Sequence, residues 1–393
     1  LNTDLTLNLS QNIPWTGGSL FLETSAQRMD LFSEHKYSWQ TSPIMIGYRQ
    51  SLFGYNSLKW DKRIEPVRYQ EAKKSYVETL ELVSANAINK FFALATAQSN
   101  YDIASFNYAN ADTLYRYAQG RYNIGTITEN EMLQLELNRL TEETNRMNAR
   151  IEMDNCMQEL RSYLGIQEER EIRVRVSSRI PDFSINLNEA LALAYENSPD
   201  IQTMKRRKLE SESAVARARA NAGLKADIYL RFGLTQTADK LPEAYRNLLD
   251  QQYVSLSISL PILDWGRGKG QVRVARSNRD LVYTQVEQNR TDFELNVRKL
   301  VKQFNLQTQR VRIAARTDET AQRRNEVARK LYILGKSTIL DLNASISEKD
   351  SARRNYVSAL YNYWSLYYTL RSMTLYDFES NKLLTEDYNL LIE

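Results

Sequence analysis

YNIGTITENE at residues 122–131 and YILGKSTILD at residues 332–341 share a tyrosine, a glycine and a threonine at matching positions, 210 residues apart. Glycine takes the left-handed conformation that ends many helices without steric cost. A threonine three residues later can cap the first turn of a returning helix. The sequence therefore predicts two helical hairpins. Their tips contain Gly125, Thr128, Gly335 and Thr338.

The repeat extends well beyond these turns. At the same offset and without a gap, Ile44, Ile46, Tyr48 and Leu52 align with Val254, Leu256, Ile258 and Ile262. Each copy contains strands, a long helix, a tight turn and a helix that runs back. The repeated unit is therefore a duplicated assembly rather than a short solenoid repeat.

The predicted organisation follows from this duplication. Repeat 1 is expected over residues 1–187, with strands at about 1–57, a helical hairpin at about 64–164 and a connector at about 165–187. Repeat 2 is expected over residues 188–376, with a helix at about 188–222, strands at about 225–263 and a helical hairpin at about 271–373, before a C-terminal tail at 377–393. Repeat 1 lacks a leading helix, which by symmetry should precede Leu1.

The strand regions alternate apolar and polar residues with a period of two. In repeat 2 the apolar positions are Ile228, Leu230, Phe232 and Leu234, then Val254, Leu256, Ile258 and Leu260. Strands of a membrane β-barrel alternate in this way, and so do strands of a soluble sandwich with one buried face. Tryptophans are enriched at membrane–water interfaces, so tryptophans at or just beyond the strand ends favour the membrane barrel. These are Trp15, Trp39, Trp60 and Trp265. The residues expected to face lipid are Leu230, Phe232, Leu256 and Ile258.

A helix of unusual length is expected after each group of strands. Between Ile64 and Gly120 there is no glycine and one proline, Pro66, at the expected first turn. Roughly 55 residues can therefore form one helix of about 80 Å. Leu80, Ala87, Leu94, Tyr101, Tyr108 and Tyr115 recur at every seventh position, and Val297, Phe304 and Val311 continue that phase in repeat 2. A sustained heptad predicts coiled-coil packing.

The composition excludes several classes of function. Lys and Arg total 52 against 48 Asp and Glu, and the charges are interspersed, so no basic stripe offers a surface to nucleic acid. The mean hydropathy of -0.55, without an apolar run of about eighteen residues, argues against membrane-spanning helices. The single histidine, His35, and the missing nucleotide-binding and protease motifs predict no catalytic site, no cofactor and no metal site. The GRGKG stretch at residues 266–270 lacks the spacing of a phosphate loop and is interpreted as a bend before a helix.

Three segments, taken in order, resemble the TolC-like outer-membrane efflux protein family over essentially the whole chain. LNEALALAYENSPDI (187–201), with the charged helix after it, is similar to the helix that leads to the family's barrel. SLSISLPILDWGRGKG (255–270), with QSLFGYNSL (50–58) in repeat 1, is similar to the junction between strand and helix. The third segment is the Tyr-x-x-Gly-x-x-Thr-x-x-Asp turn at 332–341.

The resemblance implies a membrane protein of mixed α and β structure in the bacterial outer membrane. It implies a homotrimer with four strands per protomer in a twelve-stranded β-barrel, which a long α-helical coiled-coil barrel continues into the periplasm. The implied function is passive export of small molecules, metal ions or proteins within a tripartite efflux or secretion system. The implied partners are outer-membrane lipid, a periplasmic adaptor protein at the hairpin tips and an inner-membrane transporter that supplies energy. The stretch SQNIPWTGGSLFLE (10–23) has no counterpart in repeat 2 and is interpreted as an insertion at the outer mouth.

The resemblance also implies a gate at the second hairpin tip. In relatives this turn narrows the periplasmic entrance with a ring of aspartates and a tyrosine that makes closing contacts. Carried over by position, these residues are Asp341 and Tyr332, and Glu131 is the repeat-1 partner of Asp341. This chain has Ala344 and Ser337 where relatives carry a second Asp and an Arg, with Lys336 adjacent, so different closing contacts are expected. The residues assigned to the gate are Asp341, Glu131, Tyr332 and Lys336; the alternative is that Asp341 only caps or solvates a helix start.

From the residues alone a second function stays open. A soluble coiled-coil scaffold with a small β domain would show the same heptads and the same alternation. Extraction behaviour separates the two hypotheses, because a duct is found in the membrane fraction and depends on detergent, whereas a scaffold gives a soluble pool.

Overall fold

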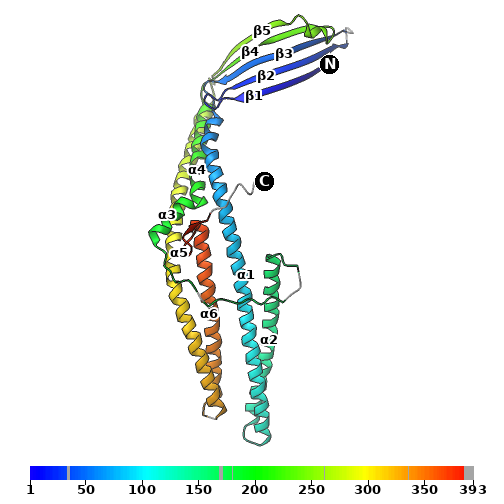
Figure 1. The fold of residues 1–393 in the computed structure, drawn as a ribbon. Helices are drawn as coiled ribbons and strands as arrows, with labels where there is room; N and C mark the ends of the chain where they lie inside the picture. The colour runs from blue at the N-terminus through cyan, green and yellow to red at the C-terminus, as the bar shows by residue number, and fades with distance from the viewer. Residues whose placement is uncertain (33–35, 168–170, 179, 261, 335, 385–393) are drawn as a thin grey trace. The chain divides into compact units, whose positions relative to one another are not determined.

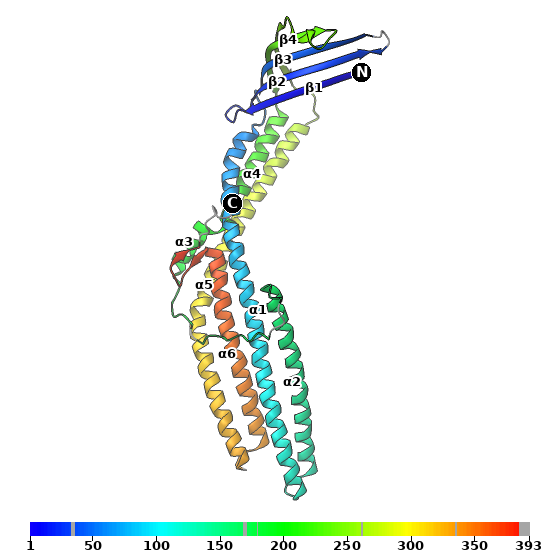
Figure 2. The same ribbon diagram turned by 45° about the vertical axis from the view of Figure 1, so that its right-hand side comes forward.

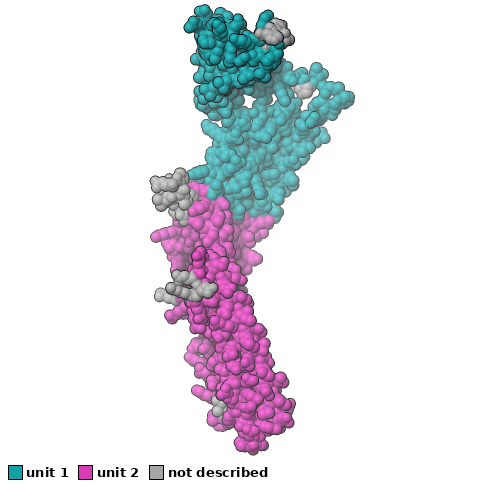
Figure 3. All heavy atoms as spheres, turned by 90° about the vertical axis from the view of Figure 1, so that its right-hand side faces the viewer, with its two compact units in different colours: residues 1–72, 199–291 teal, residues 73–198, 292–393 magenta. Residues whose placement is uncertain are grey.

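The computed structural model describes residues 1–32, 36–167, 171–178, 180–260, 262–334 and 336–384. The chain divides into two compact units, coloured separately in Figure 3. Unit 1 comprises residues 1–72 and 199–291, and unit 2 comprises residues 73–198 and 292–393. Each unit therefore contains segments from both repeat 1 and repeat 2. His35 and Gly335 lie outside the described residues.

Unit 1 contains one antiparallel sheet, shown in Figure 1. Its strands, in spatial order, are β1 (Asn2–Asn12), β2 (Ser19–Leu31), β3 (Lys36–Ser51), β4 (Lys225–Ala238) and β5 (Leu249–Ser259). The two repeats meet between β3 and β4, where Ile46 lies opposite Phe232. The period-two alternation thus predicted strands correctly in both repeats.

The sheet has five strands rather than the four that the resemblance implied. At an offset of 210 residues β2 and β3 correspond to β4 and β5, whereas β1 corresponds to no strand of repeat 2. The additional stretch at residues 10–23 contains the turn between β1 and β2, in which Gly17 has a φ of +76° and donates to the carbonyl of Ile13 (2.9 Å). The additional sequence therefore builds a hairpin that widens the sheet by one strand.

The two long helices confirm the duplication. Helix α1 (Ser57–Asn123) and helix α5 (Arg267–Ile333) both have 67 residues, and their ends differ by the same offset as the sequence repeat. Both begin earlier than expected, so that Pro66 lies inside α1 instead of in its first turn. The cause is a polar side chain before each helix: the Asn56 side chain accepts from the amide of Lys59 (3.0 Å), and Asp264 accepts from the amide of Gly268 (2.8 Å).

Residues 188–222 form two helices instead of the single helix that was expected. Helix α3 (Leu187–Asn197) ends at Ser198, and helix α4 (Pro199–Ala222) begins at a proline, which is tolerated at the start of a helix but not inside one. In unit 1, α4 is held to α1 by Arg206, which donates to Glu71 (2.9 Å). Hydrogen bonds from Arg206 also hold the pKa of Glu71 below its ordinary value.

Unit 2 is helical. Its helices are the remainders of α1 and α5, the returning helices α2 (Glu129–Tyr163) and α6 (Ile339–Thr374), and α3. Two short strands, β6 (Tyr376–Asp377) and β7 (Lys382–Leu383), pair with each other, and all of these residues except Tyr376 lie in the segment that was expected to be a tail. Figure 2 shows the two helical hairpins side by side, with the connector after α2 crossing them. Among the described helices, none has an apolar stretch long enough to cross a membrane.

The heptad positions of α1 and α5 form the core of unit 2. Leu94, Val297 and Phe304 are fully buried, and Val311 is nearly so. Phe304 packs on Tyr363 of α6, with ring centroids 5.2 Å apart. Coiled-coil packing along these positions is therefore confirmed.

The heptad positions of α1 that lie nearer the hairpin tip pack in a different way. Tyr101, Tyr108 and Tyr115 lie beneath guanidinium groups of α2, and Tyr101 also packs against the apolar cluster that includes Leu94 and Met153. The distances from guanidinium carbon to ring centroid are 5.6 Å for Arg150 on Tyr101, 4.1 Å for Arg146 on Tyr108 and 5.5 Å for Arg139 on Tyr115. A ladder of cation–π contacts thus joins α1 to α2.

Candidate functional site

The first hairpin tip has the geometry that its glycine predicted. Gly125 has a φ of +74°, and its amide donates to the carbonyl of Tyr122 (2.8 Å). The next amide, of Thr126, donates to the carbonyl of Arg121 (2.9 Å). This pair of bonds is a Schellman motif, which satisfies the last carbonyls of α1 and turns the chain.

The second tip repeats this arrangement where it is described. The amide of Lys336 donates to the carbonyl of Leu331 (2.9 Å), as that of Thr126 does to Arg121. Thr128 and Thr338 are the N-cap residues of α2 and α6, as predicted. Each threonine hydroxyl accepts from the amide three residues later, at 3.3 Å from Glu131 and 3.1 Å from Asp341.

Glu131 and Asp341 complete these caps. The Glu131 carboxylate accepts from the amide of Thr128 (3.1 Å), and the Asp341 carboxylate accepts from the amide (3.4 Å) and the hydroxyl (2.8 Å) of Thr338. Hydrogen bonds from Thr338 are the main cause that lowers the pKa of Asp341. Both acids are exposed at the tips, so they combine a capping role with a surface charge. Their assignment to a gate stays a prediction.

The other two residues assigned to the gate lie in different surroundings. Tyr332 is half-buried and lines a cavity of about 220 Å³ between α1 and the α5–α6 hairpin, together with Tyr117, Leu114 and Leu342. Burial raises the pKa of Tyr332, so the phenol is neutral at physiological pH. Lys336 is exposed. The structure therefore brings Tyr332 into the seam between hairpins and leaves Lys336 on the surface of the tip.

The four residues expected to face lipid share one face of the sheet. Leu256 lies opposite Ile228, so alternation along β4 and β5 places Leu230, Phe232 and Ile258 on the same side. The pairings continue this face to β1. Its exposed apolar residues are Leu5, Leu7, Leu9, Leu20, Leu22, Ile44, Ile46, Phe232, Val254, Leu256 and Ile258. Leu230 is half-buried.

The opposite face carries polar groups that the sequence did not single out. Arg49 lies over the ring of Tyr229 (5.5 Å), and Arg231 donates to the amide oxygen of Gln251 (3.2 Å). The Phe21 ring also lies on this face, stacked on Tyr229 and placed where a Cβ at Gly47 would stand. Alternation could have identified the polar positions, but not the glycine that gives the phenylalanine its space.

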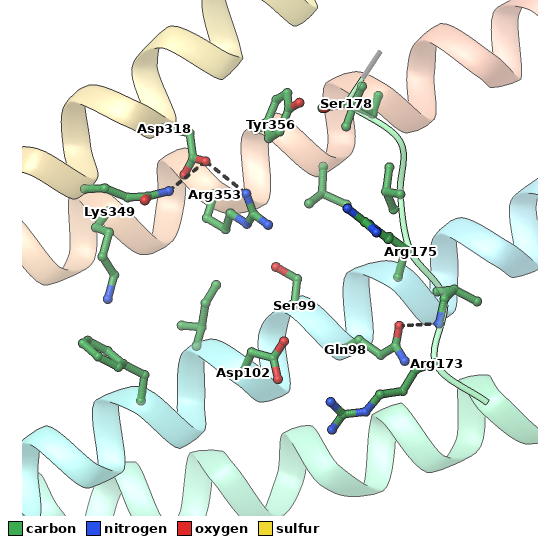
Figure 4. A pocket seen from close by; sticks show the side chains of 18 of the residues that line it. Gln98, Ser99, Asp102, Arg173, Arg175, Ser178, Asp318, Lys349, Arg353 and Tyr356 are labelled. Carbon is green, nitrogen blue, oxygen red and sulfur yellow. Dashed lines mark hydrogen bonds and ion pairs between the residues drawn. The ribbon is translucent and has the colours of Figure 1, made fainter. Parts of the chain in front are cut away.

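Unit 2 contains a larger cavity, of about 720 Å³, that sequence reasoning missed. Its walls are α1, α5, α6, Met153 of α2 and connector residues 173–176 and 178, and Figure 4 shows several of the lining side chains. The Asp318 carboxylate accepts from Gln322 (3.0 Å) and from Arg353 (3.1 Å) across the α5–α6 seam. Arg173 and Arg175 extend from the connector, whose alternating arginines and valines were the one available signal.

Comparison with known proteins connects this geometry to a family. Residues 190–374 match the sequence model of the outer membrane efflux protein family. This segment is an outer membrane efflux protein domain. The match covers α3 after its first turn and continues to the end of α6, so the efflux protein domain includes β4, β5, the second hairpin and Asp341. Curated protein sequences give no match to the chain.

Solved structures share the fold over nearly the whole chain. The CmeC outer membrane channel of Campylobacter jejuni is similar with a TM-score of 0.71 and 15% identity, over 100% of this chain and 80% of that one. The open state of the MtrE outer membrane channel of Neisseria gonorrhoeae gives 0.69 and 13%, over 98% and 82%. The outer membrane protein VceC of Vibrio cholerae gives 0.67 and 14%, over 95% and 86%. The efflux protein domain therefore lies in a chain whose first half also has the fold of these channels.

Proposed function

We propose that three copies of this chain assemble into an exit duct in the bacterial outer membrane. The duct passively exports small molecules, metal ions or proteins from the periplasm and performs no catalysis itself. A periplasmic adaptor protein binds the exposed hairpin tips, and an inner-membrane transporter supplies the energy. The match of residues 190–374 to the outer membrane efflux protein family and the fold shared with outer membrane channels support this function.

The observation that carries the proposal is the apolar face of the sheet. Eleven exposed apolar side chains cover it from β1 to β5, and a continuous apolar surface of this extent needs a lipid or protein partner. Trp15, Trp60 and Trp265 lie near the end of the sheet that joins the helices, in the turn after β1, the first turn of α1 and the turn before α5. Rings of this kind sit at membrane interfaces, so lipid explains both features.

Unit 2 also offers surfaces for neighbouring copies. Along α2 an unpartnered heptad stripe is exposed, formed by Leu133, Leu137, Leu140, Met147 and Ile151. Along the outer side of α5 a second stripe repeats every seven residues, with Leu306, Ile313 and Val327 exposed by more than half. Such stripes are typical of coiled-coil seams that are filled by another helix.

The charges of these two helices are complementary. Helix α2 contains eight acidic and four basic residues, and three of those arginines are stacked on α1 tyrosines. The unit 2 part of α5, residues 292–333, contains ten basic and five acidic residues. We propose that α2 of one copy packs antiparallel to α5 of the next. With the tips level, Met147 then lies opposite Ile313, and Leu133 lies opposite Val327.

Cross-linking tests this assembly. Met147→Cys combined with Ile313→Cys, in a Cys156→Ser background, should give disulfide-linked trimers in mild detergent. Met147→Cys combined with Leu306→Cys is the matched control, because it is displaced by one heptad, and should give little product. Equal cross-linking of both pairs, or a monodisperse monomer by light scattering, would contradict the seam.

The lipid face is tested separately. Leu256→Arg should lower the yield of membrane-inserted trimer, because an arginine near the bilayer midplane costs about 2–4 kcal/mol. Ser257→Arg, one residue away on the opposite face, should be tolerated. Normal yield of both variants, together with a soluble pool of protein, would instead favour the coiled-coil scaffold.

A further inference from the structure

The connector contains a short extended segment, residues 171–178, with the sequence EIRVRVSS. Its burial alternates: Ile172, Val174 and Val176 are half-buried, and Arg173 and Arg175 are exposed. Alternating burial is the behaviour of a β-strand that lies with one face on a core. Ile172 and Val174 pack against the core that includes Leu94 and Leu160. The segment nevertheless belongs to neither of the two sheets of the described chain.

The backbone groups of the inward residues are engaged by side chains of the helices. The amide of Val174 donates to the Gln98 side chain (3.2 Å), and the same side chain donates to the carbonyl of Ile172 (3.4 Å). The amide of Ile172 meets the sulfur of Met157 (3.3 Å). One edge of the segment is thus closed by α1 and α2.

At Arg173 and Arg175 the other edge is open. In an extended chain the amide and carbonyl of one residue point to the same edge, and those of the next residue point to the opposite edge. The outward edge therefore belongs to Arg173 and Arg175. Within the described residues, no hydrogen bond is made by the backbone of either residue. Two successive outward residues whose backbone N–H and C=O groups have no hydrogen-bond partner among the described residues can act as a template for a further strand.

The charge along this edge selects the strand that would fit. Arg173 is 3.7 Å from Glu171 and its side chain is 70% exposed, so that pairing is loose. Arg175 has no ion pair with any described residue. Across the cavity, Asp318 is already held by Arg353, and the remaining acids, Asp102 and Glu326, lie on α1 and α5. Arg173 and Arg175 therefore place positive charge along this edge of the connector.

We propose that residues 171–178 are a docking site for an extended acidic segment of a partner protein, which adds to the open edge as a β-strand. Its backbone pairs with Arg173 and Arg175, and its acidic side chains face the two guanidinium groups. Main-chain pairing gives such complexes their affinity, and alternate side chains give them their specificity. The proposal concerns a surface of unit 2 alone and does not depend on the export function or on the trimer.

The test uses the purified full chain in mild detergent and a fluorescein-labelled peptide that alternates glutamate and valine. Fluorescence anisotropy should show saturable binding of this peptide. The same peptide with N-methylated amides along one edge should bind at least about tenfold more weakly, because backbone hydrogen bonds are lost. A peptide with lysine in place of glutamate should not bind. Equal binding of the N-methylated peptide, or no binding of the glutamate peptide, would overturn the proposal.

Two proline variants locate the site. Arg175→Pro removes an outward amide and should weaken binding of the glutamate peptide about tenfold or more. Val176→Pro is the matched control: it places the same ring one residue later, removes an inward amide and should bind within about twofold of the unchanged chain. Circular dichroism and light scattering confirm that both variants keep the fold. Unchanged binding by a folded Arg175→Pro variant would also overturn the proposal.

Discussion

Asp341 and Glu131 occupy the same position, the third residue of a helix that returns from a hairpin tip. Both close a capping box, but the shorter aspartate also accepts a hydrogen bond from the Thr338 hydroxyl (2.8 Å). Because the bonds from Thr338 lower its pKa, Asp341 is charged at neutral pH. Its charge therefore serves the cap of α6 and is displayed at the tip at the same time.

The lowered pKa predicts that the second tip loosens in acid. A carboxyl group with a lowered folded pKa stabilises the fold above its unfolded pKa, and that contribution is lost as the pH falls through the folded pKa. A nitroxide on Leu340→Cys, in a Cys156→Ser background, should become more mobile below about pH 4. Asp341→Asn should remove this dependence, since the amide does not titrate. An electron paramagnetic resonance spectrum that does not change with pH in the labelled variant that keeps Asp341 would contradict the prediction.

The tip residues could be predicted because caps depend on neighbours in sequence. Gly125, Thr128 and Thr338 act on amides and carbonyls within about five positions, so the pattern contains the whole interaction. Arg175 was missed for the opposite reason. The segment around it is held by Gln98, which is 76 residues away from Val174, and no local pattern specifies that contact.

Among the elements, the α1–α2 hairpin shows which features of helix packing a heptad pattern can predict and which it cannot. The spacing of Tyr101, Tyr108 and Tyr115 correctly predicted the face of α1 that meets a partner helix. It did not predict that arginines of α2 cover the rings, because a heptad fixes which positions meet and not which chemistry they use. The quadrupole of a tyrosine ring attracts a cation above its face, by about 0.5–1 kcal/mol at an exposed site and by about 2 kcal/mol or more where the pair is desolvated.

A double-mutant cycle measures the free energy of a cation–π contact in this ladder. Arg146 lies closest to its ring, at 4.1 Å from Tyr108. We expect a coupling free energy of about 0.5–1 kcal/mol between Arg146→Met and Tyr108→Leu, in thermal unfolding followed by circular dichroism. Tyr108→Phe retains the π face and should retain most of the coupling. Additive effects of the Met and Leu changes would show that the contact contributes only packing.

For the whole molecule, the fifth strand changes how copies can close into a barrel. In an antiparallel sheet of five strands, the two edge strands, β1 and β5, run in the same direction. Identical copies would therefore meet with β1 parallel to β5 of the next copy, whereas four strands per copy close with antiparallel pairs throughout. The alternation predicted each strand correctly, but the number per copy was taken from relatives, and the additional stretch at residues 10–23 shows why it was wrong.

A deletion tests this consequence. Removing residues 1–17 takes away β1 and its turn and leaves β2 to β5, an even number of antiparallel strands. We expect this variant to give at least the trimer yield of the full chain in detergent, measured by light scattering. Removing residues 1–34 also takes away β2, leaves three strands and should abolish trimers. A loss of trimers on deletion of β1 alone would mean that β1 forms the seam between copies.

The tip residues also bear on the properties of the assembled channel. In a trimer Asp341 occurs three times, and if the tips converge, three carboxylates share a narrow aqueous neck that attracts cations. Asp341→Asn removes three charges while its side-chain oxygen can still accept from Thr338, so the cap is kept and only the ring changes. In planar bilayers the purified trimer should prefer cations and be blocked by a trivalent cation, and Asp341→Asn should reduce both effects. Glu131→Gln is the matched control at the other tip: an equal reduction would place both acids in the neck. Selectivity and block that survive Asp341→Asn would leave this residue with the capping role alone.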